Sequence, residues 1–174
     1  SLYTAKQWGV SPAEIDPSIL KRVPLRFSYK EGYFDDTYQI IPTHSYTTIF
    51  SNMLNHVRIK VILNTDALQY IKIKGNMVYV NDELFDGLLV YTGPLDELFN
   101  SCYGALPYRS LRFDWKYTES DSFQKYPVVA YPQAEGYTRI TEYKKLPVQL
   151  VKGSSYAVEY PLQYEPGLKQ EPYY

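Results

Sequence analysis

Arginine and tyrosine side chains carry most of the chemistry that this sequence could perform. Five arginines stand near tyrosines, at or near the expected ends of strands or helices: Arg22, Arg26, Arg109, Arg112 and Arg139. A planar guanidinium in such a place suits bidentate binding of phosphate, although an arbitrary arginine more often lies on a solvated or ion-paired surface. The chain also has 20 tyrosines among its 174 residues, and their flat rings with a hydroxyl at the edge suit sugars and bases as well as sheet faces.

The common catalytic constellations are missing from the sequence. Only His44 and His56 could act as imidazole bases, and both are expected to be surface or loop residues. The single cysteine, Cys102, provides neither a Cys/His nucleophile nor a metal-ligand cluster. The glycine motifs GxGxxG and GxxxxGKS do not occur. We therefore predict no catalytic side chain and no metal site within these residues.

Composition narrows the class of protein. The net charge is −1 with acidic and basic residues interspersed, so neither nucleic acid nor an anionic membrane surface is an expected partner. One cysteine cannot form an internal disulfide, and no apolar run approaches the ~20 residues of a membrane span. The opening SLYTAKQWG has no apolar stretch typical of a secretory signal. These features predict a cytoplasmic protein, and its length suits one domain or one domain plus part of another.

Helix signals occur at three places in the chain. Ser11-Pro12-Ala13-Glu14 has the N-cap, first-turn proline and glutamate that predict a helix start. Residues 44–54 have apolar residues at helical spacing. Gly93-Pro94, followed by Asp96 and Glu97, predicts a turn and a helix that ends at Gly104.

Most of the remaining signals predict antiparallel strands. The expected strands are 25–29, 57–63, 70–74, 77–80, 88–92, 110–117, 126–131, 137–143, 148–151 and 156–160. This order predicts an α+β fold, a twisted antiparallel sheet with a few helices. Because Arg109 and Arg139 each open a strand close after a tyrosine, we expect them on neighbouring strands facing one cleft.

Several stretches of sequence resemble one enzyme family. The segments YTAKQWG, LKRVPLRF, YFDDTYQ, TDAL, YTGPLDELF, LPYRSLRF, YTRITEYK and EPYY occur in the order found in the UDP-galactopyranose mutase family. These flavoenzymes interconvert the pyranose and furanose forms of UDP-galactose in polysaccharide biosynthesis. The resemblance implies reduced FAD as the cofactor of a longer flavoprotein and a UDP-sugar as substrate, and it allows a homodimer. Reduced flavin performs the chemistry there, while the protein positions the diphosphate.

The resemblance also implies roles for individual residues. Tyr3 matches a tyrosine that stacks on uracil, and Trp8 a tryptophan beside the nucleotide and sugar. Arg22 and Arg139 match the two diphosphate arginines, Arg22 on a mobile loop. Tyr33 and Tyr173 match tyrosines that bind the phosphates, and Arg109 matches an arginine near the sugar and flavin. Thr92-Gly93-Pro94 matches a turn beside FAD.

The sequence also departs from the family pattern. The family begins with a Rossmann unit that binds FAD and ends with a further helix, and neither occurs here. We therefore expect a middle fragment that binds no cofactor and is inactive alone. Where the family has QGIPxGGYT, this chain has Gln39-Ile40-Ile41-Pro42-Thr43-His44-Ser45-Tyr46, with side chains in place of three glycines. A non-catalytic sugar-nucleotide-binding or interaction module and a different flavin oxidoreductase therefore stay open as alternatives.

The family match predicts three regions. Residues 1–54 are expected to be the end of a helical domain, with a mobile lid segment and a connecting strand. Residues 55–107 should return towards an FAD-binding domain. Residues 108–174 should form the antiparallel substrate-binding sheet and a C-terminal arm.

Overall fold

A computed structural model describes residues 2–20, 27–29 and 34–173. The chain divides into two compact units, one made of Ser1–Tyr46 with Tyr108–Tyr174 and the other of Thr47–Pro107. Helices and two antiparallel sheets are present, which confirms the predicted α+β class. Arg22, Arg26 and Tyr33 lie outside the described residues, as do the first two residues of the strand predicted at 25–29, and residues 27–29 do not form a strand.

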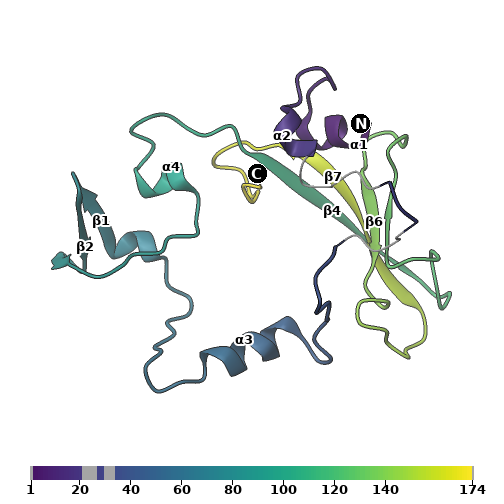
Figure 1. Ribbon diagram of the computed structural model, residues 1–174, viewed down its shortest axis with the longest axis horizontal. Coiled ribbons are helices and arrows are strands. Elements are labelled where there is room, and N and C mark those ends of the chain that lie inside the picture. The colour runs from purple at the N-terminus through teal and green to yellow at the C-terminus, as the bar shows by residue number, and fades with distance from the viewer. Residues whose placement is uncertain (1, 21–26, 30–33, 174) are drawn as a thin grey trace. The chain divides into compact units, whose positions relative to one another are not determined.

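The first unit is built on a four-stranded antiparallel sheet (Figure 1). Its strands are β4 (Arg109–Thr118), β5 (Val128–Ala130), β6 (Arg139–Glu142) and β7 (Ser154–Gln163), in the spatial order β4-β7-β6-β5. β-Forming segments separated by turn residues predicted all four strands. The strand predicted at 148–151 is wrong, because those residues form no strand and only Val148 makes an isolated bridge, with Lys145.

The strand register assigns side chains to the two faces of this sheet. Directly paired residues share a face, and successive residues alternate between faces. Arg109 pairs with Gln163, and Arg139 pairs with Glu159. The side chains of these four residues therefore lie on one face of the sheet, which we call the arginine face. Arg112, Tyr160 and Glu142 lie on the opposite face.

The two arginines of the arginine face are not on neighbouring strands. β7 lies between β4 and β6, so that expectation was wrong. Arg109 and Arg139 pair with positions four residues apart along β7, roughly 13 Å at the usual strand rise.

A short helix at the N-terminus belongs to the same unit. α1 (Leu2–Trp8) contacts β7 (Figure 1). α1 was not predicted, and seven residues are too few for an isolated helix to be stable. The predicted helix at Ser11 is instead a turn, in which Ser11 N–H donates to Glu14 Oε2 at 2.9 Å. α2 (Pro17–Leu20) follows it.

The second unit holds a three-stranded meander, β1 (Ile71–Lys74), β2 (Met77–Val80) and β3 (Glu83–Phe85). η1 (Ala67–Gln69) precedes the meander, α4 (Leu95–Leu98) follows it, and α3 (Tyr46–Leu54) leads into the unit. The strands predicted at 57–63 and 88–92 are wrong, and the third strand is β3 instead. α4 ends before Gly104, so the predicted helix is shorter than expected.

The C-terminal arm adds to the open edge of β4. Tyr173 forms an antiparallel bridge with Arg109, and its N–H donates to the Arg109 carbonyl at 2.6 Å. Ser110 Oγ donates to the Glu171 carbonyl at 2.8 Å. The arm therefore places Tyr173 beside the strand that carries Arg109. None of the helices in the described part of the chain has the length and apolarity that a membrane crossing needs.

Candidate functional site

An arginine–glutamate pair forms the centre of the arginine face. Arg139 Nε donates to Glu159 Oε2 at 2.7 Å, and the side chain of Arg139 is 35% exposed whereas that of Glu159 is 3% exposed. The pairing of β6 with β7 puts these residues opposite each other. The buried carboxylate therefore binds Nε and orients the terminal nitrogens of a guanidinium that solvent reaches.

The second carboxylate oxygen of Glu159 does not take part in this ion pair. Glu159 Oε1 is buried and has no hydrogen-bond partner in the structure. A buried polar atom without a partner is costly. Gln7 Oε1 and Gln124 Oε1 are also buried without a partner, so it is the pairing with the partly exposed Arg139 that makes Glu159 a candidate functional residue.

Tyr3 of α1 lies against the same guanidinium. Burial raises the pKa of Tyr3, while the charge of Arg139 and a hydrogen bond from it lower that pKa. Burial would lower the pKa of Arg139, but the hydrogen bond and charge of Glu159 outweigh burial and raise it, with smaller contributions from Tyr3 and Tyr173. Arg139 is therefore a permanent cation, and both tyrosines are close enough to interact with it.

Arg109 binds the other end of α1. Its Nε donates to the Gln7 carbonyl at 3.3 Å, and its Nη1 donates to Gln163 Oε1 at 3.1 Å. A Cβ on Gly9, whose φ is +68°, would lie 2.8 Å from Nη1. Burial lowers the pKa of Arg109. The Nε of Arg109 thus holds the C-terminal end of α1 on β4, where a cation also complements the helix dipole, and Nη1 links Arg109 to β7.

An aromatic group borders the pair on the same face. Trp115 stacks on Tyr143 with ring centroids 5.2 Å apart, and Phe113 lies 6.2 Å from Trp115. Burial raises the pKa of Tyr143, and the charge of Glu159 adds to that effect. The cation therefore has flat apolar surface next to it.

The structure brings together four of the residues predicted for the site: Tyr3, Arg109, Arg139 and Tyr173. Trp8 is the last residue of α1 and is half-buried. Arg22 and Tyr33 lie outside the described residues. Sequence reasoning missed Glu159, Gln7 and Gln163. An acidic residue directly after two apolar ones in a predicted strand was the available signal for Glu159.

The turn predicted to lie beside FAD belongs to the second unit. A Cβ on Gly93 would lie 2.4 Å from the hydroxyl of Tyr91, so the chain's own ring fills that space. Pro94 precedes α4, a helix of four residues, and makes no side-chain cap. Ile40, His44 and Ser45 carry exposed side chains at the positions where the family pattern has glycines. These residues do not by themselves form a flavin site.

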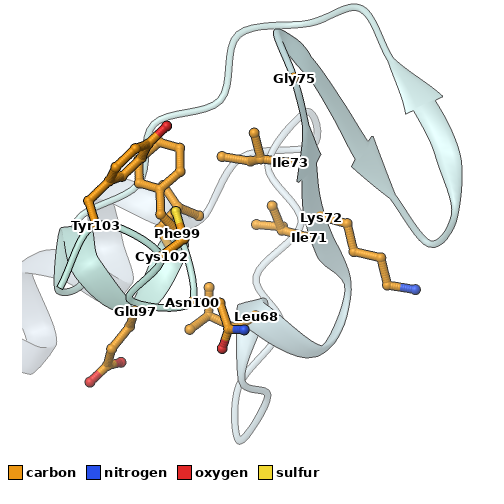
Figure 2. A pocket seen from close by; sticks show the side chains of 11 residues that line it. Leu68, Ile71, Lys72, Ile73, Gly75, Glu97, Phe99, Asn100, Cys102 and Tyr103 are labelled. Carbon is orange, nitrogen blue, oxygen red and sulfur yellow. The ribbon is translucent and has the colours of Figure 1, made fainter. Parts of the chain in front are cut away.

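An open groove of about 560 Å³ lies within the second unit. Leu68, Ile71 and Ile73 line it on one side and Phe99, Cys102 and Tyr103 on the other (Figure 2). The charged groups of Lys72 and Glu97 point away from it (Figure 2), and Lys72 pairs with Asp82 at 2.5 Å. The groove has no convergent polar groups of the kind that orient a ligand. Within the described ranges, no cluster of three or more His, Cys, Asp or Glu residues could hold a metal ion.

Comparison with known proteins identifies relatives of the chain. The profile of a family described as UDP-galactopyranose mutase matches residues 1–174. The UDP-galactopyranose mutase of Mycoplasma pneumoniae is 38% identical over 145 residues, which cover 83% of this chain and 36% of the relative. That of Mycoplasma genitalium is 39% identical over 147 residues, with the same coverage. The dTDP-fucopyranose mutase of Escherichia coli is 37% identical over 146 residues, covering 82% of this chain and 37% of the relative. The chain thus spans just over a third of the length of these relatives.

Proposed function

This chain belongs to the UDP-galactopyranose mutase family, and from that premise we propose that its arginine face binds the diphosphate of a UDP-sugar in an isomerase that converts UDP-galactopyranose to UDP-galactofuranose. The observation that carries the proposal is the Arg139–Glu159 pair, with the guanidinium partly exposed and its Nε held at 2.7 Å. A guanidinium with fixed orientation presents its terminal N–H groups to two phosphate oxygens at once.

The neighbours of the pair suit the rest of such a ligand. Tyr3 and Tyr173 interact with Arg139, and in our proposal Tyr3 provides a ring for uracil and Tyr173 a hydroxyl for the phosphates. Trp8, at the end of the helix that carries Tyr3, provides a ring for base or sugar. Arg109 holds this helix on the sheet, so in our proposal it supports the site and contacts the sugar only if its bonds rearrange. Arg22 and Tyr33 are proposed as further phosphate ligands.

The flavin-dependent chemistry is a separate part of the proposal. We propose that reduced FAD is held by other parts of the longer protein, with Thr92-Gly93-Pro94 of residues 55–107 adjacent to it, and that this chain alone is inactive. When bound, the flavin supplies the covalent catalysis, and the residues of this chain hold the diphosphate in place for it. The proposed compartment is the cytoplasm, and a homodimer of the longer protein is part of the same proposal.

A non-catalytic sugar-nucleotide-binding module is the second candidate. The observation that favours it is the exposed side chains of Ile40, His44 and Ser45 in place of glycines. Turnover of UDP-galactopyranose by the complete reduced protein, followed by chromatography of the two sugar nucleotides, separates the candidates. Both candidates predict UDP binding, and only the isomerase predicts the furanose product.

Titration of UDP and uridine tests the diphosphate assignment. The informative variant is Arg139→Lys, because removing the side chain altogether would leave the buried Glu159 without its partner. Lysine keeps the positive charge but lacks the paired N–H groups of the guanidinium. UDP affinity should therefore fall about tenfold, while uridine affinity stays unchanged.

Arg112→Lys is the matched control. Arg112 lies over the Tyr160 ring at 4.1 Å on the opposite face, and this variant should bind UDP like the wild type. If the wild type binds UDP and the Arg139→Lys variant binds it equally well, the assignment of Arg139 to the diphosphate is wrong.

A further inference from the structure

Lys6 binds the turn that leads into the strand carrying Arg139. Its ammonium donates to the Tyr131 carbonyl at 3.0 Å, to the Tyr137 carbonyl at 2.9 Å and to the Ala134 carbonyl. An ammonium has three N–H donors, so these contacts use all of them. The three acceptors come from seven consecutive residues of the β5–β6 connection.

The backbone of this connection is shaped to present these carbonyls. Tyr131 N–H donates to the Thr138 carbonyl at 2.8 Å, which closes the turn at its base. Ala134 N–H donates to the Tyr131 carbonyl at 3.3 Å, and Gly136 has a φ of +81°. The carbonyls of residues 131, 134 and 137 therefore converge on one point, as they would around a bound cation.

α1 depends on polar contacts for its position. It has seven residues, and the one residue that it buries fully is Gln7, which is polar. Hydrophobic burial therefore holds this helix weakly. Lys6 and Tyr3 are three positions apart, so they project from the same side of the helix. Tyr137, whose carbonyl accepts from Lys6, lies two positions before Arg139 in the chain.

We propose that Lys6 is a positioning residue for nucleotide-diphosphate binding: as a tethered cation in a cage of three carbonyls, it fixes the helix that carries Tyr3 and Trp8 against the turn that leads into Arg139. This inference rests on the proposed function for its effect on UDP. Its effect on α1 can be measured without any nucleotide.

The test compares two lysine-to-methionine variants of the complete protein. Lys6→Met keeps the apolar stem and removes the ammonium. Lys116→Met makes the same change at an exposed position of β4 on the opposite face, where the ammonium lies 3.5 Å from Asp114. UDP and uridine are titrated calorimetrically, and amide exchange of residues 2–8 is followed by mass spectrometry.

We expect Lys6→Met to weaken UDP binding about fivefold to tenfold and to speed amide exchange in α1. Because an amine can re-enter a carbonyl cage, added methylammonium should restore part of the UDP affinity. Tetramethylammonium, which has no N–H donor, should not. Lys116→Met should match the wild type in all of these measurements.

Two results would overturn the inference. The first is an amide exchange rate of α1 that is the same in the Lys6→Met variant as in the wild type. It would mean that the carbonyl cage does not hold the helix. The second is faster exchange with unchanged UDP affinity, which would mean that the helix position does not matter for binding. If the wild type itself binds no UDP, the proposed function fails, and the amide-exchange data still decide whether Lys6 anchors α1.

Discussion

Two buried carboxylates in the same sheet, Glu142 and Glu159, differ in how completely they are hydrogen-bonded. Glu142 is 0% exposed and Glu159 2% exposed. Glu142 receives four hydrogen bonds: Oε1 from Phe123 N–H and Ser154 Oγ, and Oε2 from Gln124 N–H and Lys145 Nζ. The Glu159 side chain accepts one hydrogen bond, from Arg139 to Oε2, and its Oε1 has no hydrogen-bond partner.

In our proposal, the difference separates a structural carboxylate from one in a binding site. The bonds of Glu142 hold the loop at Phe123 and Gln124 on the sheet, and Phe123 stacks on Tyr156 with centroids 3.9 Å apart. A fully satisfied buried carboxylate contributes to stability, whereas a half-satisfied one costs stability and persists where function needs it. The comparison therefore predicts that mutations on the two faces have different consequences.

The largest effect is expected for Glu142→Gln. The amide would present N–H groups to two of the four donors, so the free energy of unfolding should fall by about 3 kcal/mol. Urea denaturation measures the change. A loss below about 1 kcal/mol would mean that the four bonds contribute little and would remove the contrast between the two carboxylates.

Acid should remove the same stabilisation in the wild type. Burial raises the pKa of Glu142, but the hydrogen bonds from Ser154, Phe123, Gln124 and Lys145 outweigh it and lower that pKa from 4.5 to about 2. A carboxyl with a lowered folded-state pKa stabilises the protein above its unfolded pKa, and this stabilisation is lost as the pH falls through the folded value.

The stability difference between wild type and the Glu142→Gln variant should therefore narrow as the pH falls from about 4.5 to about 2. Denaturation at several pH values in this range provides the measurement. A difference independent of pH would contradict the assignment of the ionised form.

A smaller effect is expected for Ser154→Ala. Ser154 is 2% exposed and its Oγ donates to Glu142 Oε1 at 2.6 Å. The variant removes one of the four bonds with almost no change in volume, so unfolding should become easier by about 2 kcal/mol. In the Glu142→Gln background the same change should cost less, because a hydrogen bond to a charged group is stronger than one to an amide. Equal costs in both backgrounds would contradict the pairing.

The smallest effect on stability is expected for Glu159→Gln. The amide oxygen still accepts from Arg139 Nε, and the new NH₂ replaces an oxygen that has no partner. The free energy of unfolding should change by less than about 1 kcal/mol. A loss as large as that of Glu142→Gln would show that Glu159 is a structural carboxylate too.

Sequence patterns predicted the four-stranded sheet because its β-forming segments are separated by turn residues at short intervals. They could not predict α1, because the contacts that stabilise it join residues at least 102 positions apart in the chain. These contacts are those of Lys6 with the Tyr137 carbonyl and of Arg109 with the Gln7 carbonyl. The strands predicted at 57–63, 88–92 and 148–151 fail because β-forming residues do not form a strand without a partner edge.

The site was predictable in part. Arg139 and Tyr3 come from the family resemblance, and the structure brings them together. Glu159 becomes visible only when the strand register sets it opposite Arg139, 20 residues earlier in the chain. The expectation of neighbouring strands for Arg109 and Arg139 failed because the last strand, β7, inserts between β4 and β6. No local pattern encodes that insertion.

The most direct test of the central claim follows the Nε–H signals of the arginines by NMR while UDP is added to the complete protein. The account predicts that the Arg139 signal shifts and saturates with UDP, that uridine leaves it in place, and that the signal of Arg112, on the opposite face over Tyr160, does not move with either ligand. An Arg139 signal that stays fixed at saturating UDP, or an Arg112 signal that moves equally, would contradict the claim that the half-satisfied pair on the arginine face binds the diphosphate.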